Sequence, residues 1–273
     1  MMNITKYSSH CFFENVNGIR FDDAYDIIKR KAYIKYVAEH HINYLHSQDD
    51  DMLNVTYFPD IEYLTVPDDA ENLEALYSLR NLKGIELRAK QLRTICLSNF
   101  PQLTHLSIGD GQAQDMSEIA KISTLTHLYC QQWKLENLCS FTGFDKLEVL
   151  VLNFCGRLKR LTGLEQLTSL NGLRIEYCLK LVDIDAIITL AKTLKSLRIM
   201  DCNKVNSYDG IQALVGLEKL QLFTSQTSVK NYLQSLDFIS KLKRLKSFYT
   251  NYRIVNGDMT PLLGIEDAVR DKS

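Results

Sequence analysis

LEVLVLNFCGRL, residues 147–158, is followed by two stretches of the same design, LNGLRIEYCLKL at residues 170–181 and LKSLRIMDCNKV at residues 194–205. All three have the form Leu-x-x-Leu-x-(Leu/Ile)-x-x-Cys-x-x-(Leu/Val), and they begin 23 and 24 residues apart. One helix or hairpin has a period of a few residues and does not produce so long a unit. A stack of coils does, because each coil must return a short strand to the same place.

The spacing inside each unit indicates which side chains are buried. Leu150 and Leu152 are two residues apart, so a strand directs both into the core, while Val151 between them faces outward. The cysteine closes the turn after the strand, where a small thiol fits a buried slot and donates a weak hydrogen bond to the backbone. We therefore predict a ladder of stacked thiols formed by Cys155, Cys178 and Cys202.

The strand motif recurs along most of the chain. It begins at Ile61, Leu82, Leu103, Leu125, Leu147, Leu170, Leu194, Leu217 and Leu245, with a longest step of 28 residues between the last two starts. Return segments are short early in the chain, and those at residues 183–192, 208–215 and 229–242 are long enough for helices. We predict an α/β fold: a right-handed solenoid of about nine coils, with a parallel concave β-sheet and a convex side that is 3₁₀ or extended early and helical later.

Three regions follow from this register. Residues 1–41 are expected to form an N-terminal cap, with a hairpin at residues 12–21 around Asn17-Gly18 and a helix after Asp22 or Asp23. Residues 42–253 hold the repeats, of which 42–60 are a degenerate coil and 61–253 clear coils. Residues 254–273 form a C-terminal cap or tail, in which we expect fraying or a short helix and no further strand.

The repeat resembles that of bacterial leucine-rich repeat proteins of the internalin-like type, over residues 61–263. The resemblance is carried by the short steps and by phrases such as LTGLEQLTSL at residues 161–170. It implies a scaffold that binds another protein on its concave sheet. The chain departs from the family in two respects, because cysteines replace much of the family's asparagine ladder and the sequence shows no secretion signal or surface anchor.

Composition narrows the possible partners and the compartment. The 273 residues include 32 Lys and Arg against 33 Asp and Glu, a net charge of −1, whereas nucleic-acid binders usually have a basic excess. The first residues, MMNITKYS, lack an apolar signal stretch, and no run has the length of a membrane span. Seven cysteines without paired spacing favour free thiols in a reducing compartment. We expect a cytoplasmic monomer without cofactor or metal, bound to neither nucleic acid nor membrane.

The residues expected to bind the partner face outward from the fourth coil onward. There the face gathers Tyr, Phe, Met and Arg, which are enriched where interfaces carry their energy. The alternative is that some of these rings pack on neighbouring coils. The predicted site comprises Tyr129, Gln131, Val151, Asn153, Phe154, Arg174, Glu176, Tyr177, Arg198, Met200, Asp201, Phe223, Tyr249 and Tyr252.

The motifs of catalytic sites are missing from the sequence. It contains no phosphate-binding loop, His-Glu-x-x-His, Cys-x-x-Cys or Gly-x-Ser-x-Gly. His105 and His127 occupy the same position on adjacent strands, close enough to share a metal, but no carboxylate or third histidine accompanies them, so a stacked surface pair is favoured. The leading hypothesis is a non-catalytic protein-binding scaffold, and the alternatives are an immunity or inhibitor protein that neutralises a toxin, a secreted effector, and an enzyme.

Overall fold

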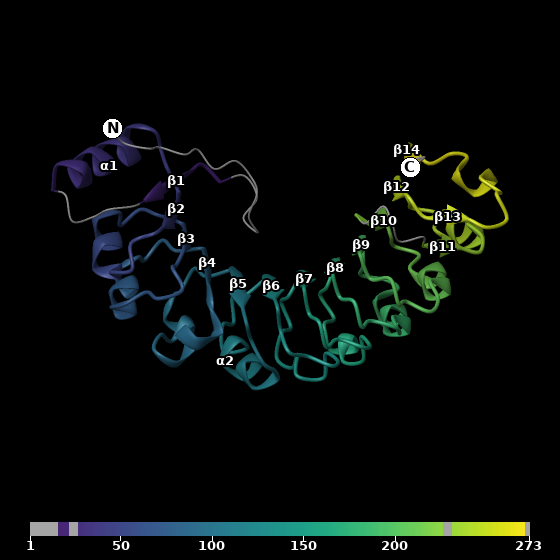
Figure 1. Ribbon diagram of the computed structural model, residues 1–273, viewed down its shortest axis with the longest axis horizontal. Coiled ribbons are helices and arrows are strands. Elements are labelled where there is room, and N and C mark those ends of the chain that lie inside the picture. Colours follow the sequence, from purple (N-terminus) through teal and green to yellow (C-terminus); the bar gives the residue numbers. More distant parts are fainter. Residues whose placement is uncertain (1–15, 22–26, 226–230, 271–273) are drawn as a thin grey trace. The chain divides into compact units, whose positions relative to one another are not determined.

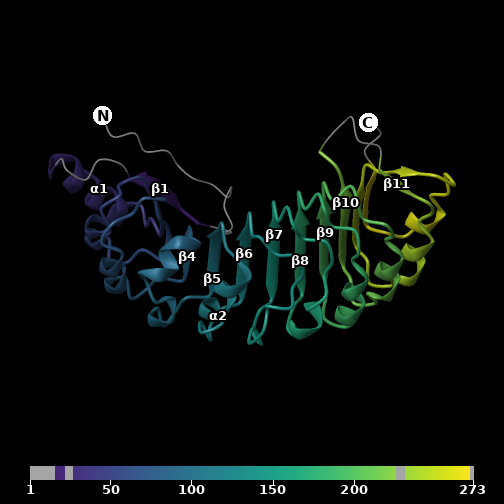
Figure 2. The same cartoon turned by 60° about the horizontal axis from the view of Figure 1, so that its bottom comes forward.

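The computed structural model describes residues 16–21, 27–225 and 231–270, and the chain divides into two compact units. Unit 1 comprises the described residues up to 111 together with 121–129, and unit 2 comprises 112–120 and the described residues from 130 onward. In each unit, parallel strands lie side by side and short helices occupy the segments that return the chain (Figure 1). The turned view shows the same layering within each unit (Figure 2).

Unit 1 begins the sheet. Its strands are β1 (Gly18–Phe21), β2 (Tyr44–Ser47), β3 (Tyr63–Thr65), β4 (Gly84–Arg88) and β5 (His105–Gly109), paired in parallel in chain order. Strand β6 (His127–Gln131) contributes residues to both units. The helices are α1 (Ile27–Glu39) and the 3₁₀ helices η1 (Met52–Tyr57), η2 (Leu73–Ser78), η3 (Ala89–Arg93) and η4 (Leu97–Asn99).

Unit 2 repeats the arrangement. Its parallel strands in sheet order are β7 (Val149–Asn153), β8 (Gly172–Glu176), β9 (Ser196–Met200), β10 (Lys219–Phe223), β12 (Ser247–Thr250) and β14 (Asp267–Arg270). A separate pair is formed by β11 (Tyr232–Leu233) and β13 (Arg253–Ile254). The helices are α2 (Met116–Ile119) and the 3₁₀ helices η5 (Ala113–Asp115), η6 (Leu164–Gln166), η7 (Asp185–Leu190), η8 (Asp209–Ala213), η9 (Asp237–Lys241) and η10 (Thr260–Leu262).

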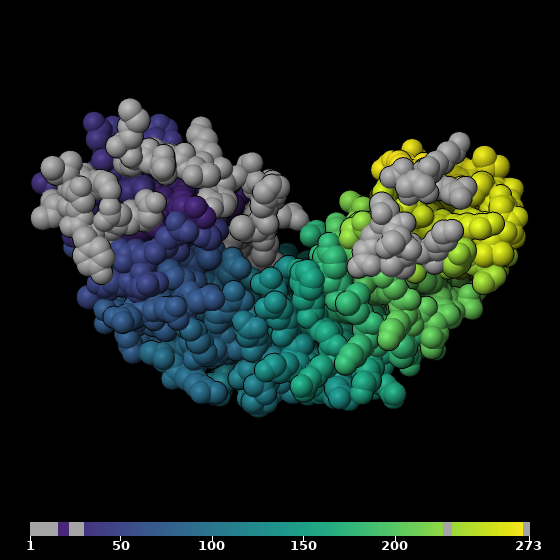
Figure 3. Space-filling view, viewed as in Figure 1, coloured from purple at the N-terminus to yellow at the C-terminus, as the bar shows by residue number. Residues whose placement is uncertain are grey.

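The core follows the repeat register. Leu150 and Leu152 of β7 are fully buried, as are the matching residues of β8 and β9. Each such side chain contributes roughly 1.5–3 kcal/mol relative to exposure. An apolar residue three positions before most motif starts is buried as well, at Phe58, Leu79, Phe100, Ile122, Phe144, Leu167, Leu214 and Leu242. The space-filling view shows successive coils packed closely through each unit (Figure 3).

The thiol ladder is part of this core. Cys155, Cys178 and Cys202 are fully buried in consecutive coils. Each Sγ lies within reach of two backbone carbonyl oxygens, one of its own coil and one of the coil before; for Cys178 these are the oxygens of Glu176 at 3.5 Å and Leu152 at 3.7 Å. The weak S–H donor is therefore satisfied where the chain leaves each strand.

The predicted fold is confirmed, and the elements add detail. Every one of the nine predicted strand motifs holds a strand. The later return segments are helical as predicted and take the 3₁₀ form in η7, η8 and η9, which are five or six residues long.

Both ends of the sheet differ from the expectation. β1 pairs in parallel with β2, so its described residues form a strand of the main sheet, and the first arm of the expected hairpin lies outside the described residues. The expected helix caps Asp22 and Asp23 also lie outside them. The tail was expected to lack a strand, but Asp267–Arg270 forms β14 beside β12. A polar segment can join a sheet edge because the pairing is made by backbone hydrogen bonds.

The N-terminal end of unit 1 is closed by aromatic packing. Tyr33 of α1 is buried and meets the ring of Phe21 edge-on at 5.2 Å between centroids. Phe21 in turn meets Phe58 edge-on at 5.1 Å. Helix α1 thereby covers apolar core that the first coil would otherwise expose.

Candidate functional site

The structure places the predicted site residues in three environments. Nine keep exposed or half-exposed side chains: Tyr129, Gln131, Phe154, Arg174, Glu176, Tyr177, Arg198, Phe223 and Tyr249. Tyr129 belongs to unit 1, and the other eight belong to unit 2. Five are buried: Val151, Asn153, Met200, Asp201 and Tyr252. We call the outward side chains of β7, β8, β9, β10 and β12 the strand face of unit 2.

Asp201 does not lie on an accessible surface. Its side chain is fully buried, and its carboxylate accepts hydrogen bonds from the Thr224 hydroxyl at 2.6 Å and the Ser225 hydroxyl at 2.6 Å. The Ser225 backbone N–H donates a third bond at 2.9 Å. The segment after β10 thus covers Asp201, and the prediction that this residue meets a partner is corrected.

Tyr252 is corrected for a related reason. It is 1% exposed, and its hydroxyl lies 3.3 Å from that of Tyr208. Burial raises the pKa of Tyr208 to about 12, and burial together with the neighbouring Tyr208 phenol raises the pKa of Tyr252 further. Both rings stay neutral and act as packing groups.

Met200, Asn153 and Val151 form the floor of the strand face. Met200 pairs with Glu176 on one side and with Phe223 on the other. In the same way Glu176 lies beside Asn153, and Arg174 lies beside Val151. The outward direction predicted for these three residues holds, but their neighbours leave 8% or less of each residue exposed.

An arginine cluster, formed by Arg198, Glu176, Phe223 and Tyr249, occupies the middle of the strand face. Arg198 Nε lies 2.9 Å from Glu176 Oε1, and the side chains are 31% and 16% exposed. The guanidinium carbon lies 4.9 Å from the centre of the Phe223 ring, a cation–π geometry. Phe223 meets Tyr249 edge-on at 5.3 Å. The charge and the rings therefore hold one another in place.

A second aromatic group, the rim pair, is formed by Phe154 and Tyr177 at the ends of β7 and β8. Their rings are parallel within 3° and their centroids are 4.4 Å apart. Both residues have left-handed backbones, with φ of 53° and 54°. Large side chains rarely adopt this conformation, and it costs on the order of 1–3 kcal/mol.

The left-handed position recurs at one place in five coils, at Asp110, Gln132, Phe154, Tyr177 and Asp201. At Phe154, Tyr177 and Asp201 this residue turns the chain from the strand toward the ladder cysteine, and its N–H still donates to the next coil, as from Phe154 to the Glu176 carbonyl at 3.0 Å. The spacing of the motif places these five residues at equivalent positions in the sequence. None of them is a glycine, so the sequence did not indicate a left-handed backbone there.

Comparisons with known proteins identify the architecture. No family model matches the sequence, and no curated protein matches it. Among solved structures, Toll-like receptor TLR13, in a complex with ssRNA13, is 18% identical, with a TM-score of 0.55 over 83% of this chain and 37% of the receptor chain. The internalin InlF of Listeria monocytogenes is 15% identical over 85% of this chain and 81% of its own, with a TM-score of 0.46.

The chain has the leucine-rich repeat fold. This rests on the likeness to TLR13 together with the parallel sheet and the stacked coils. The chain spans a little over a third of the receptor chain that it matches. At this level of identity the comparison supports the fold alone, and function has to be argued from the side chains.

The histidine pair of the leucine-rich repeat sheet lies in unit 1. The rings of His105 and His127 stack 4.1 Å apart at 15°, and each Nδ1 lies 2.9 Å from the hydroxyl of the preceding threonine. Burial, and secondarily the charge of His127, lowers the pKa of His105 to about 4. In the described residues no group of three metal-ligating side chains is found. The geometry is that of the stacked pair favoured from the sequence.

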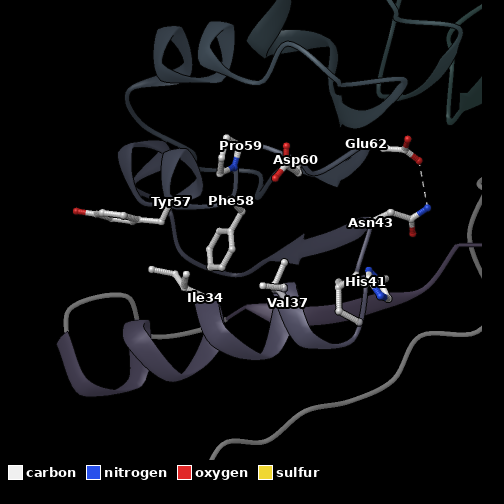
Figure 4. A pocket seen from close by; sticks show the side chains of 11 residues that line it. Ile34, Val37, His41, Asn43, Tyr57, Phe58, Pro59, Asp60 and Glu62 are labelled. Carbon is white, nitrogen blue, oxygen red and sulfur yellow. Dashed lines mark hydrogen bonds between the residues drawn. The ribbon is translucent and has the colours of Figure 1, made fainter.

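Unit 1 also contains a pocket that the sequence did not indicate. It has a volume of about 410 Å³ and lies between α1 and the segment from Tyr57 to Glu62. Figure 4 shows Ile34, Val37 and Phe58 gathered on one side and Asn43 and Glu62 on the other. Asn43 Nδ2 donates to Glu62 at 3.2 Å. The pocket combines an apolar wall with a carboxylate edge.

None of the helices in the described part of the chain is long and apolar enough to span a membrane.

Proposed function

We propose that the chain is a non-catalytic scaffold that binds a partner protein on the strand face of unit 2. The observation that carries the proposal is the arginine cluster. Arg198 is oriented by Glu176 and Phe223, and both arginine and aromatic residues are the types that dominate interface energy. Because these groups are already ordered, a partner would lose little side-chain entropy on this side of the interface.

The rim pair supports the same surface. Phe154 is 46% exposed, and it holds a strained backbone conformation beside Tyr177. A solvated rim gains nothing from two large rings at left-handed positions, where glycine or asparagine would be easier. Strain kept at one exposed place is typical of binding sites.

Capture of the partner tests the proposal. Tagged protein is used to recover binding proteins from an extract of the cells in which the chain occurs, alongside a variant with Arg198, Phe223 and Tyr249 changed to Ala. We expect recovery of a specific partner to fall at least tenfold, since removing several hot-spot residues costs several kcal/mol. A matched control changes Leu179, Ile188 and Val215, which are exposed apolar residues off the strand face.

Urea unfolding of each variant separates loss of binding from loss of folding. Equal recovery by wild type and the strand-face variant, with both folded, would place the interaction elsewhere and end the proposal. Within the scaffold function, an inhibitor of a toxin and a secreted effector differ in where the protein resides. Fractionation of cells and medium distinguishes them, because the inhibitor acts in the cytoplasm and the effector outside the producing cell.

A further inference from the structure

The pocket of unit 1, which we call the α1 pocket, is open although the residues beside it are closely packed. Tyr33 anchors helix α1 through its ring contact with Phe21, and Phe58 is only 2% exposed. The neighbouring helix residues Ile34 and Val37 are half-buried and line a cavity of about 410 Å³. Cavities of this size are typical of small-molecule sites.

The walls of the α1 pocket are held by contacts within the protein. Asn17 Nδ2 donates to the His40 carbonyl at 2.9 Å, which ties the end of α1 to the start of β1. Across the pocket, Arg30 Nη1 donates to the Tyr57 hydroxyl at 2.9 Å, and its guanidinium carbon lies 4.5 Å from the centre of the Tyr57 ring. A ligand therefore meets walls that are already ordered, and little entropy is lost on binding.

The charged groups that line the pocket are carboxylates. They belong to Asp60 and Glu62, and none of the 11 lining residues, all within the described part of the chain, is Lys or Arg. Glu62 is paired with Lys83 and accepts a hydrogen bond from Asn43 at 3.2 Å. Asp60 is exposed, and among the described residues only Asn81 donates to it, at 3.5 Å. Asp60 therefore keeps oxygen atoms that can accept from a ligand.

The end of helix α1 adds to the negative potential. Ala38 and His41 line the pocket where α1 ends at Glu39. The last carbonyl groups of a helix carry a partial negative charge, which favours cations. A bare metal ion finds too few ligands, since the described residues contain no group of three metal-ligating side chains. The combination of apolar wall and negative edge instead matches an organic cation.

We propose that the α1 pocket binds a small molecule that carries a primary ammonium group on a compact apolar body. The ammonium group pairs with Asp60 at the carboxylate edge. The apolar body packs on Ile34, Val37 and Phe58, which lie together on the other side of the pocket (Figure 4). All lining residues belong to unit 1, so this site goes beyond the proposed function and does not depend on it.

A set of matched ligands tests the charge preference. Phenethylammonium, phenethyl alcohol and phenylacetate share an aromatic body and differ in charge, and methylammonium has the charge without the body. Each is titrated into the ¹⁵N-labelled protein, and the NMR shifts of the Val37, Ile42 and Asn43 amides report binding. We expect phenethylammonium to bind about fivefold more tightly than the alcohol, as a partly exposed ion pair allows, and the other two ligands to leave the shifts unchanged.

Two variants locate the site. Asp60→Asn should weaken binding of phenethylammonium about fivefold and leave binding of the alcohol unchanged, which also shows that the pocket is intact. Ala38→Phe fills the pocket from an exposed position on α1 and should abolish binding of both ligands. The matched controls are Asp50→Asn and Ala32→Phe, because both residues are exposed and lie outside the lining. They should leave both affinities unchanged, and thermal unfolding confirms that each variant is folded.

Four results would overturn the inference. They are equal affinities for phenethylammonium and the alcohol, an unchanged affinity in Asp60→Asn, equal losses in the control variants, and binding of N-acetyl-lysine amide as tight as that of phenethylammonium. The last result would mean that the pocket takes a lysine side chain of a partner protein. None of them affects the proposed function, whose test changes Arg198, Phe223 and Tyr249 in unit 2.

Discussion

At the scale of single residues, burial separates the thiols into two groups. Cys96 and Cys139 are exposed, whereas Cys130 and the ladder cysteines are buried. The thiolate is the reactive form, and burial raises the pKa of Cys130 well above its ordinary value. The exposed thiols should therefore react faster than the buried ones.

We predict that iodoacetamide alkylates Cys96 and Cys139 in the native protein and leaves Cys130, Cys155 and Cys178 unmodified. Peptide mapping by mass spectrometry after timed exposure measures this, and the same reaction in urea shows that every thiol can be labelled. Native labelling of Cys155 at the rate of Cys139 would mean that the ladder is open to solvent.

His105 should make stability depend on pH. Its folded pKa is lowered to about 4 by burial, against about 6.5 in the unfolded chain. Between these values the unfolded state binds the extra proton, so stability is full above pH 6.5 and falls as the pH drops toward 4. Allowing for solvent screening of this half-exposed ring, the loss is roughly 1–2 kcal/mol.

Urea unfolding at several pH values compares the wild type with His105→Gln. The variant should lose that part of the pH dependence and differ little near pH 7.5. An NMR titration provides a direct check, because a His105 resonance that titrates near 6.5 would contradict the burial argument.

The sequence predicted only in part which residues of the strand face are accessible to solvent. Alternation along the strands identified Arg174, Arg198 and Phe223 as outward-facing, because that depends only on the period of a strand. Asp201 was misplaced because the covering segment at Thr224 and Ser225 comes from the one long step, which has no counterpart in the other coils.

At the scale of elements, the periodic leucines predict the strands of the repeats but not the structure at the ends of the chain. The nine motif strands were predictable because each must bury the same two side chains. β14 was missed, since Asp267–Arg270 joins the sheet through backbone hydrogen bonds, and its sequence has no leucine pattern. The left-handed turns were missed because Phe154 and Tyr177 take a conformation that their residue types disfavour.

The turn after β8 leads to a prediction about glycine. Tyr177→Ala removes the ring stack with Phe154 but keeps an L-residue at φ 54°, whereas Tyr177→Gly removes the stack and also the strain. We expect the Gly variant to be more stable than the Ala variant by about 1 kcal/mol, as urea unfolding can measure.

Tyr249 supplies the control, because it lies within β12 and its backbone is not left-handed. There the usual order applies, and Tyr249→Gly should be less stable than Tyr249→Ala by roughly 0.5–1 kcal/mol. The same order at both positions would show that the turn after β8 holds no strain.

At the scale of the whole molecule, stability is a sum of local contacts, because each coil of a solenoid packs only on its neighbours. Buried aromatic residues close unit 1 through Tyr33 and help to pack unit 2 through Phe248. Loss of either ring should therefore destabilise mainly the coils of its own unit. This differs from a globular domain, where one core is shared by all elements.

Hydrogen exchange followed by mass spectrometry tests this locality with a reciprocal pair of variants. Tyr33→Ala removes a buried ring, a loss of roughly 3–5 kcal/mol, and should speed exchange in β2, β3 and β4 while leaving β9 unchanged. Phe248→Ala should do the reverse, speeding exchange in β9, β10 and β12. If both variants speed exchange equally in every strand, the chain opens in a single cooperative step, and its stability cannot be divided among coils.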